Sequence, residues 1–150
     1  MRYVGFLMLS LAIVLGGCAS HDMEKAENGQ RHLQNVNLVN ADLGNLDLQN
    51  VNLSNSNLRS ANLTQTNLSG ATLMNVNFQG AFLQKAILTN TNCQGADFLN
   101  TNLEYANFQG ANLTHARFNG ANVIKADFRG VTGLTDTQKA NFKSKGAIVD

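Results

Sequence analysis

Residues 36–84 read VNLVNADLGNLDLQNVNLSNSNLRSANLTQTNLSGATLMNVNFQGAFLQ, and every fifth residue of this stretch is large and apolar. The same step runs without a break from Leu33 to Phe128, so it occurs twenty times. This central position holds Leu thirteen times and otherwise Phe78, Phe98, Phe108, Phe118, Phe128, Cys93 and Val123. A strict short period predicts a solenoid, in which each unit buries its face only against its neighbours.

The residue two places before each centre is small. Ala fills that position eleven times, beginning at Ala41 and Ala61. Residues two apart in an extended segment point to the same side, so we expect both positions to face inward. Each buried centre should contribute about 1.5–3 kcal/mol before the entropy of ordering is subtracted.

The residue two places after each centre is suited to a turn. Asn stands there eight times and Gly six times, and both tolerate the positive φ that tight turns need. A right-angled turn every five residues closes a square, which gives twenty residues per coil and five coils. Adjacent coils should lie about 4.8 Å apart, the usual strand spacing. Residues twenty apart, such as Leu63, Leu83 and Leu103, should then stack in interior columns.

This pattern resembles the pentapeptide-repeat family, whose consensus is A-(D/N)-L-x-x. Asn or Asp fills the slot before the centre fifteen times in twenty, and the departures are His32, Thr72, Phe82, Ile87 and Arg117. The resemblance covers about two thirds of the chain. It implies an all-β fold, a right-handed quadrilateral β-helix solenoid of about five coils, over residues 33–131.

Residues 132–150 break the repeat and are predicted to form a short helical cap and tail. Thr135 with Gln138 three places later has the spacing of a capping box, and Gly146 can end the helix. Solenoids need such caps because the last coil would otherwise expose its core. We expect Phe142 to cover that end.

The N-terminus is typical of an exported lipoprotein. Met1-Arg2 precedes a twelve-residue apolar run, and residues 1–17 read as a signal peptide. The following Leu15-Gly16-Gly17-Cys18 resembles the lipobox of bacterial lipoproteins, which implies lipid, including palmitate, on Cys18. Residues 18–32 would be a tether reaching about 20 Å. Ala19 after the cysteine favours the outer membrane, facing the periplasm. The alternative is a retained signal anchor with an unmodified cysteine.

No catalytic constellation is found. Cys93 should point into the core as a small hydrophobe that resists thiol reagents, while His115 should face outward at a turn. His21, His32 and His115 lack metal-ligand spacing, so we expect no enzyme activity, cofactor, metal or small-molecule substrate. Only 14% of residues are charged, and residues 33–131 balance five acidic against five basic side chains. We therefore expect no nucleic-acid partner.

One surface feature departs from the repeat. Phe82 and Ile87 replace the outward Asn, and Tyr105 occupies a turn position between Lys85 and Lys125 of the adjacent coils. Ile124 should face out on the same side, near Glu104. Together these residues are a candidate apolar interaction patch with a basic rim. The alternative is sequence drift on a surface that constrains little.

Three functions remain open. The favoured hypothesis is a membrane-tethered lipoprotein acting as a rigid scaffold that binds a protein partner or a second copy of itself. A DNA-mimicking topoisomerase-protection protein of the quinolone-resistance type would need an acidic cytoplasmic rod, so the charge balance and export signal argue against it. A surface-exposed or secreted effector or adhesin is the third hypothesis.

Overall fold

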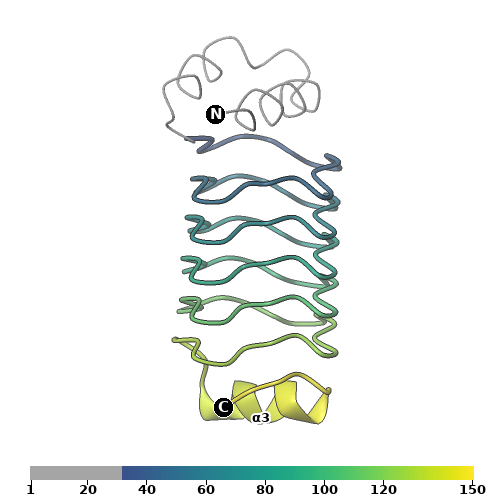
Figure 1. Ribbon diagram of the computed structural model, residues 1–150, viewed down its shortest axis with the longest axis vertical. Helices are drawn as coiled ribbons and strands as arrows, with labels where there is room; N and C mark the ends of the chain where they lie inside the picture. The colour runs from purple at the N-terminus through teal and green to yellow at the C-terminus, as the bar shows by residue number, and fades with distance from the viewer. Residues whose placement is uncertain (1–31) are drawn as a thin grey trace.

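The computed structural model describes residues 32–150. They form a rod of stacked coils with a helix across one end (Figure 1). Parallel bridges join residues twenty apart, from His32 and Asn52 at one end to Asn112 and Thr132 at the other. The repeat is therefore a four-sided β-helix with twenty residues per coil, as its period predicts.

Each side of a coil is hydrogen-bonded to both neighbouring coils. The amide of a central residue donates to a carbonyl of the next coil, as Leu33 does to Asn52 at 2.7 Å. The amide of the slot before the centre donates to the previous coil, as Asn57 does to Val36 at 2.9 Å. These bonds fix the register, so residues twenty apart lie above one another along the rod.

The corners have the backbone conformation that the Asn and Gly pattern predicts. All twenty residues that stand two places after a centre have φ between 54° and 70°. This is the left-handed region, which strains a residue carrying a Cβ atom. Six of these corners are neither Asn nor Gly: Ser60, Gln65, Lys85, Tyr105, His115 and Lys125.

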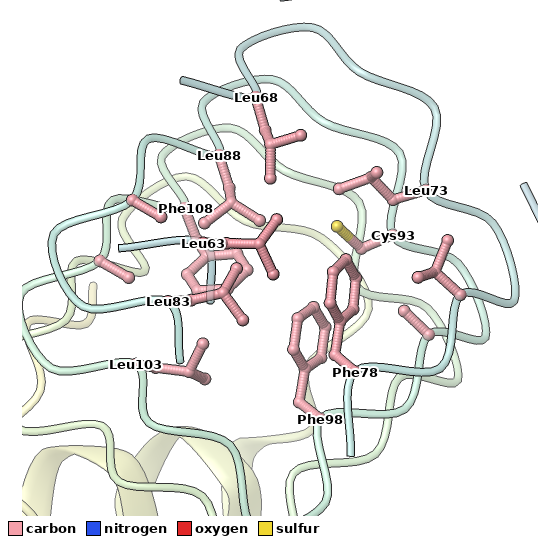
Figure 2. Close-up of a cluster of buried hydrophobic side chains, with 14 of the residues drawn as sticks. Leu63, Leu68, Leu73, Phe78, Leu83, Leu88, Cys93, Phe98, Leu103 and Phe108 are labelled. Atoms are coloured by element: carbon pink, nitrogen blue, oxygen red, sulfur yellow. The ribbon is translucent and has the colours of Figure 1, made fainter. Parts of the chain in front are cut away.

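The core consists of the stacked central residues, all twenty of which are buried. Figure 2 shows Leu63, Leu83 and Leu103 in one column and the rings of Phe78 and Phe98 face to face. Those two ring centroids are 5.1 Å apart, close to the expected coil spacing. Buried hydroxyls two before the centre are also satisfied: Thr66 donates to the Leu43 carbonyl at 2.7 Å.

The slot before the centre has a role that the repeat pattern alone did not reveal. All fifteen Asn and Asp side chains there accept a hydrogen bond from the amide two residues later. Asn102, for example, accepts from the Glu104 amide at 3.1 Å. These Asx turns give a hydrogen-bond acceptor to the amide of the residue after each centre, which the coil-to-coil ladder does not pair.

The expected cap is present as helix α3, Asp136–Ser144. Thr135 and Gln138 form the predicted capping box. At the other end Gly146 has φ 86°, and the Ala147 amide reaches back to the Phe142 carbonyl at 3.0 Å, which makes a Schellman motif. Phe142 is buried, and its ring centroid lies 4.8 Å from that of Phe128, so it covers the end of the core as expected.

The chain after α3 returns to the rod, which was not predicted. Ile148 forms a parallel bridge with Asp127, and the Lys125 amide donates to the Gly146 carbonyl at 2.9 Å. The tail thus extends the backbone ladder of the last coil on one side.

Some predictions lie outside the described residues. The signal peptide over residues 1–17 and lipid attachment at Cys18 stay predictions, as does most of the 18–32 tether. Within residues 32–150, no helix is long and apolar enough to cross a membrane.

Candidate interaction surface at one corner of the rod

The candidate patch is built around one of the four corner columns. We call Asn45, Gln65, Lys85, Tyr105 and Lys125 the patch corner. The next column along the chain, Asn50, Gly70, Asn90, Gly110 and Gly130, is the regular corner. Four of the six corners that are neither Asn nor Gly belong to the patch corner, and they follow one another in consecutive coils.

Bulky residues at the patch corner adopt a conformation that disfavours them. Lys85, Tyr105 and Lys125 have φ of 58°, 59° and 55°, a region that costs a side-chain-bearing residue about 1–2 kcal/mol. The coil-to-coil ladder holds them there, since the Lys85 amide donates to the Glu104 carbonyl at 2.9 Å and the Tyr105 amide to that of Ile124 at 3.0 Å. The backbone imposes the conformation and does not require these side chains.

Two of the patch residues contact one another directly. Lys125 Nζ donates to Tyr105 Oη at 2.9 Å and lies 5.0 Å from the centre of the Tyr105 ring. The hydrogen bond to Tyr105 raises the pKa of Lys125, and the charge of Glu104 acts in the same direction. Lys125 is therefore a cation held beside an aromatic ring at the rod surface.

Phe82 and Ile87 lie on the two faces that meet at Lys85. They are 48% and 39% exposed, so the sequence correctly placed both outward. Neither side chain can accept a hydrogen bond, and the structure shows no acceptor among residues 32–150 for the amides of Gln84 and Thr89, which follow two places later. Both positions therefore expose apolar surface and lack the Asx hydrogen bond of the repeat. Each missing hydrogen bond would contribute about 0.5–1.5 kcal/mol to the free energy of unfolding.

Ile124 and Glu104 complete the patch. Ile124 is 46% exposed and lies one coil beyond Glu104, which is partly buried. Among the described residues, six large apolar side chains are exposed, and four belong to this patch. The patch comprises Phe82, Lys85, Ile87, Glu104, Tyr105, Ile124 and Lys125. The Tyr105–Lys125 pair lies in the same corner region as Phe82, Ile87 and Ile124. Among residues 32–150, the structure shows no hydrogen bond or ring contact between that pair and these three side chains.

Several titratable groups outside the patch form structural interactions. Burial raises the pKa of Cys93 to about 12, its thiol lies 3.3 Å from Thr91 Oγ1, and His115 is exposed, so no dyad forms. Asp97 pairs with Arg117 at 3.4 Å and Asp127 with Arg129 at 2.6 Å. Residues 32–150 contain no cluster of three or more His, Cys, Asp or Glu that could hold a metal ion.

A family model described as pentapeptide repeats matches eight copies, over residues 32–65, 52–90, 66–102 and 91–130. It supports the fold class expected from the sequence, a right-handed quadrilateral β-helix. No curated protein matches the chain.

Solved structures agree with this match. A pentapeptide-repeat protein from the thylakoid lumen of Arabidopsis thaliana is 29% identical, with a TM-score of 0.72 over 78% of this chain and 81% of that one. Rfr23 from the cyanobacterium Cyanothece is 27% identical, with a TM-score of 0.68 over 87% and 99%.

HetL, a pentapeptide-repeat protein involved in the regulation of heterocyst differentiation in the cyanobacterium Nostoc, is 30% identical. Its TM-score is 0.66 over 73% of this chain and 51% of HetL, so the alignment spans about half the length of HetL. None of these three proteins is described as an enzyme.

Proposed function

Because this chain belongs to the pentapeptide-repeat family, we propose that it is a non-enzymatic interaction scaffold, anchored to a membrane through lipid on Cys18. The rod is rigid by construction, since every coil is hydrogen-bonded to its neighbours. A rigid rod on a tether can present a fixed surface to a partner at a defined distance from a membrane.

The observation that carries the proposal is the patch. Of the six large apolar side chains exposed among residues 32–150, four gather in one region: Phe82, Ile87, Tyr105 and Ile124. Exposed apolar residues scattered singly need no explanation, but a group rimmed by polar residues is typical of interaction sites. Left-handed strain at Lys85, Tyr105 and Lys125 adds to the argument, because strained residues concentrate at functional sites.

The membrane anchor rests on the sequence. A short positive segment, a twelve-residue apolar run and Leu15-Gly16-Gly17-Cys18 follow one another in the order of a lipoprotein signal. Ala19 supports sorting to the outer membrane. The rod would then face the periplasm, where a buried Cys93 needs no disulfide partner.

Mass spectrometry of the mature N-terminus tests the anchor. We expect a diacylglyceryl Cys18, and the Cys18→Ser variant should remain unprocessed or leave the membrane fraction. An intact N-terminus at Met1 in the membrane fraction would refute lipidation. Protease added to whole cells distinguishes the two orientations, since a periplasmic rod is protected and a surface adhesin is cleaved.

Site-specific photo-crosslinking in intact envelopes tests the scaffold. A crosslinker at Phe82 should yield discrete adducts with another protein. The matched control is Asn92, which fills the same slot on another face and should yield few. Equal adducts at both positions, or none at Phe82, would contradict a partner surface at the patch.

A further inference from the structure

We propose that the patch binds a short acidic and apolar segment of another protein, which lies along the rod axis beside the patch corner. Lys85 and Lys125 would receive its carboxylates, and Phe82, Ile87 and Ile124 its apolar side chains. This inference rests on the proposed scaffold function and identifies the kind of partner that the scaffold takes.

The charges of the corner favour an acidic occupant. Lys85 and Lys125 are exposed and stand two coils apart, which is about 10 Å at the usual strand spacing. Among residues 32–150 neither forms a salt bridge, whereas Arg117 and Arg129 each pair with an aspartate. The one carboxylate of the patch, Glu104, is partly buried. Two cations without a salt bridge are thus presented on either side of Tyr105, although the charge of Glu104 acts on Lys125.

The apolar groups are placed so that one segment could reach them all. Phe82 and Ile87 flank Lys85 at one end of the patch, and Ile124 precedes Lys125 at the other. A segment running along the axis would meet an apolar site and a cation at each end, with Tyr105 between them. Apolar anchors with a charged rim are the usual composition of a specific interface.

A second copy of the chain fits this surface less well. Two copies packed antiparallel about Tyr105 would bring Lys85 of one copy against Lys125 of the other, and like charges oppose association. The apolar area is also small. The four exposed apolar side chains of the patch are 39–48% exposed, so together they offer on the order of 300 Å². A stable protein dimer buries about 800 Å² on each side, whereas a short segment needs less.

Peptide selection tests the proposal. The full-length protein, purified in detergent, is used to select from a displayed library of random twelve-residue peptides, with the Phe82→Asn, Ile87→Asn variant for counter-selection. We expect the enriched peptides to combine net negative charge with apolar residues. Enrichment of neutral or basic peptides, or no enrichment specific to the wild type, would overturn the inference.

The best enriched peptide is then titrated against charge variants. Lys85→Glu with Lys125→Glu should weaken its binding at least tenfold, and added salt should weaken binding to the wild type. The control, Lys143→Glu with Lys145→Glu, makes the same change of charge on the exposed cap and should alter binding less than twofold. Equal binding by both double variants would refute the role of the two lysines.

Two further measurements exclude other occupants. The Cys18→Ser protein is mixed with phosphatidylglycerol vesicles, and binding that Lys85→Glu with Lys125→Glu abolishes would show a lipid surface as the ligand. Sedimentation that reveals a dimer dissociated by Phe82→Asn with Ile87→Asn would show a second copy. Either result overturns the acidic segment, while crosslinking at Phe82 independently decides whether the patch is a partner surface at all.

Discussion

The patch corner and the regular corner have the same backbone but different side chains. The Gly70 amide donates to the Thr89 carbonyl at 2.9 Å, just as the Lys85 amide donates to Glu104. At the regular corner Asn and Gly alternate from Asn50 to Gly110, and a Cβ atom added at Gly70 or Gly110 would lie 2.4 Å from Oδ1 of the Asn one coil earlier. The Asn side chain of one coil therefore occupies the space that the next Gly leaves open.

The difference shows that the solenoid itself does not require the patch corner to be bulky. At the regular corner the left-handed backbone positions are filled by Asn and Gly, the residues that tolerate this conformation best. The patch corner places Gln65, Lys85, Tyr105 and Lys125 in that same conformation. In a repeat this uniform, the places where side chains and backbone disagree are the candidates for function.

The largest effect is expected beneath the patch corner, in the core. Leu83 is fully buried, so Leu83→Asn removes packed apolar volume and buries an amide without a partner. We expect a loss of several kcal/mol in the free energy of unfolding, measured by chemical denaturation. The outward control, Asn62→Ser, should cost about 1 kcal/mol, because it removes the bonds to the Thr64 amide and Asp42. Similar losses for both variants would contradict the inward assignment of the central position.

The sequence predicted the coil, the columns and the turn positions because each depends on a spacing that the chain repeats. It did not predict the role of Asn62 and its equivalents, which the repeat pattern identified only as outward-facing Asn or Asp. The available signal was that only Asn and Asp recur there, and their short side chains reach the amide two residues on. The return of Ile148 to the rod depends on hydrogen bonds to Ala126 and Phe128 of the last coil. Residues after the repeat form these bonds, so no periodic pattern predicts them.

A reciprocal exchange between the two corners should give an intermediate effect. Gly110→Tyr forces a side chain into the left-handed region and against Asn90 Oδ1, so the protein should lose about 2 kcal/mol. Tyr105→Gly relieves the same strain, and unfolding should become harder by up to about 1 kcal/mol. Thermal and urea unfolding measure both. A clear destabilisation by Tyr105→Gly would mean that Tyr105 supports the fold rather than a partner.

The smallest effect concerns Asp127, which lies two residues after Lys125 of the patch corner. Hydrogen bonds from Arg129 lower the pKa of Asp127 to about 2, below the usual value of about 3.9. A lowered folded-state pKa stabilises the fold above pH 4 and loses that contribution as the pH falls from 4 to 2. Asp127→Asn should therefore be less stable than the wild type at pH 7 and equal to it near pH 2. In an Arg129→Gln background, the stability lost on Asp127→Asn at pH 7 should be smaller. A stability difference that does not change with pH would contradict the lowered pKa of Asp127.

The site was predictable in outline only. The sequence placed Phe82, Ile87, Tyr105 and Ile124 outward because the repeat fixes which positions face solvent. It could not show the bond between Lys125 and Tyr105, since two side chains one coil apart can take several rotamers. Nor could it show that Phe82 and Ile87 leave the amides of Gln84 and Thr89 without an acceptor, because that follows from the Asx turns.

The most direct test measures stability and binding in one protein, the Phe82→Asn, Ile87→Asn double variant. If the patch is kept for a partner at the expense of the fold, the variant restores two Asx bonds and should gain about 1 kcal/mol for each. With the photo-crosslinker placed at Ile124, the affinity for the partner should fall at least tenfold, equivalent to about 1.4 kcal/mol. The control, Asn92→Phe with Asn77→Ile, removes the bonds to the Gln94 and Gln79 amides in columns without an apolar neighbour and should lose a similar amount of stability. A double variant that is less stable than the wild type, or that crosslinks equally well, would contradict the assignment of this corner to binding.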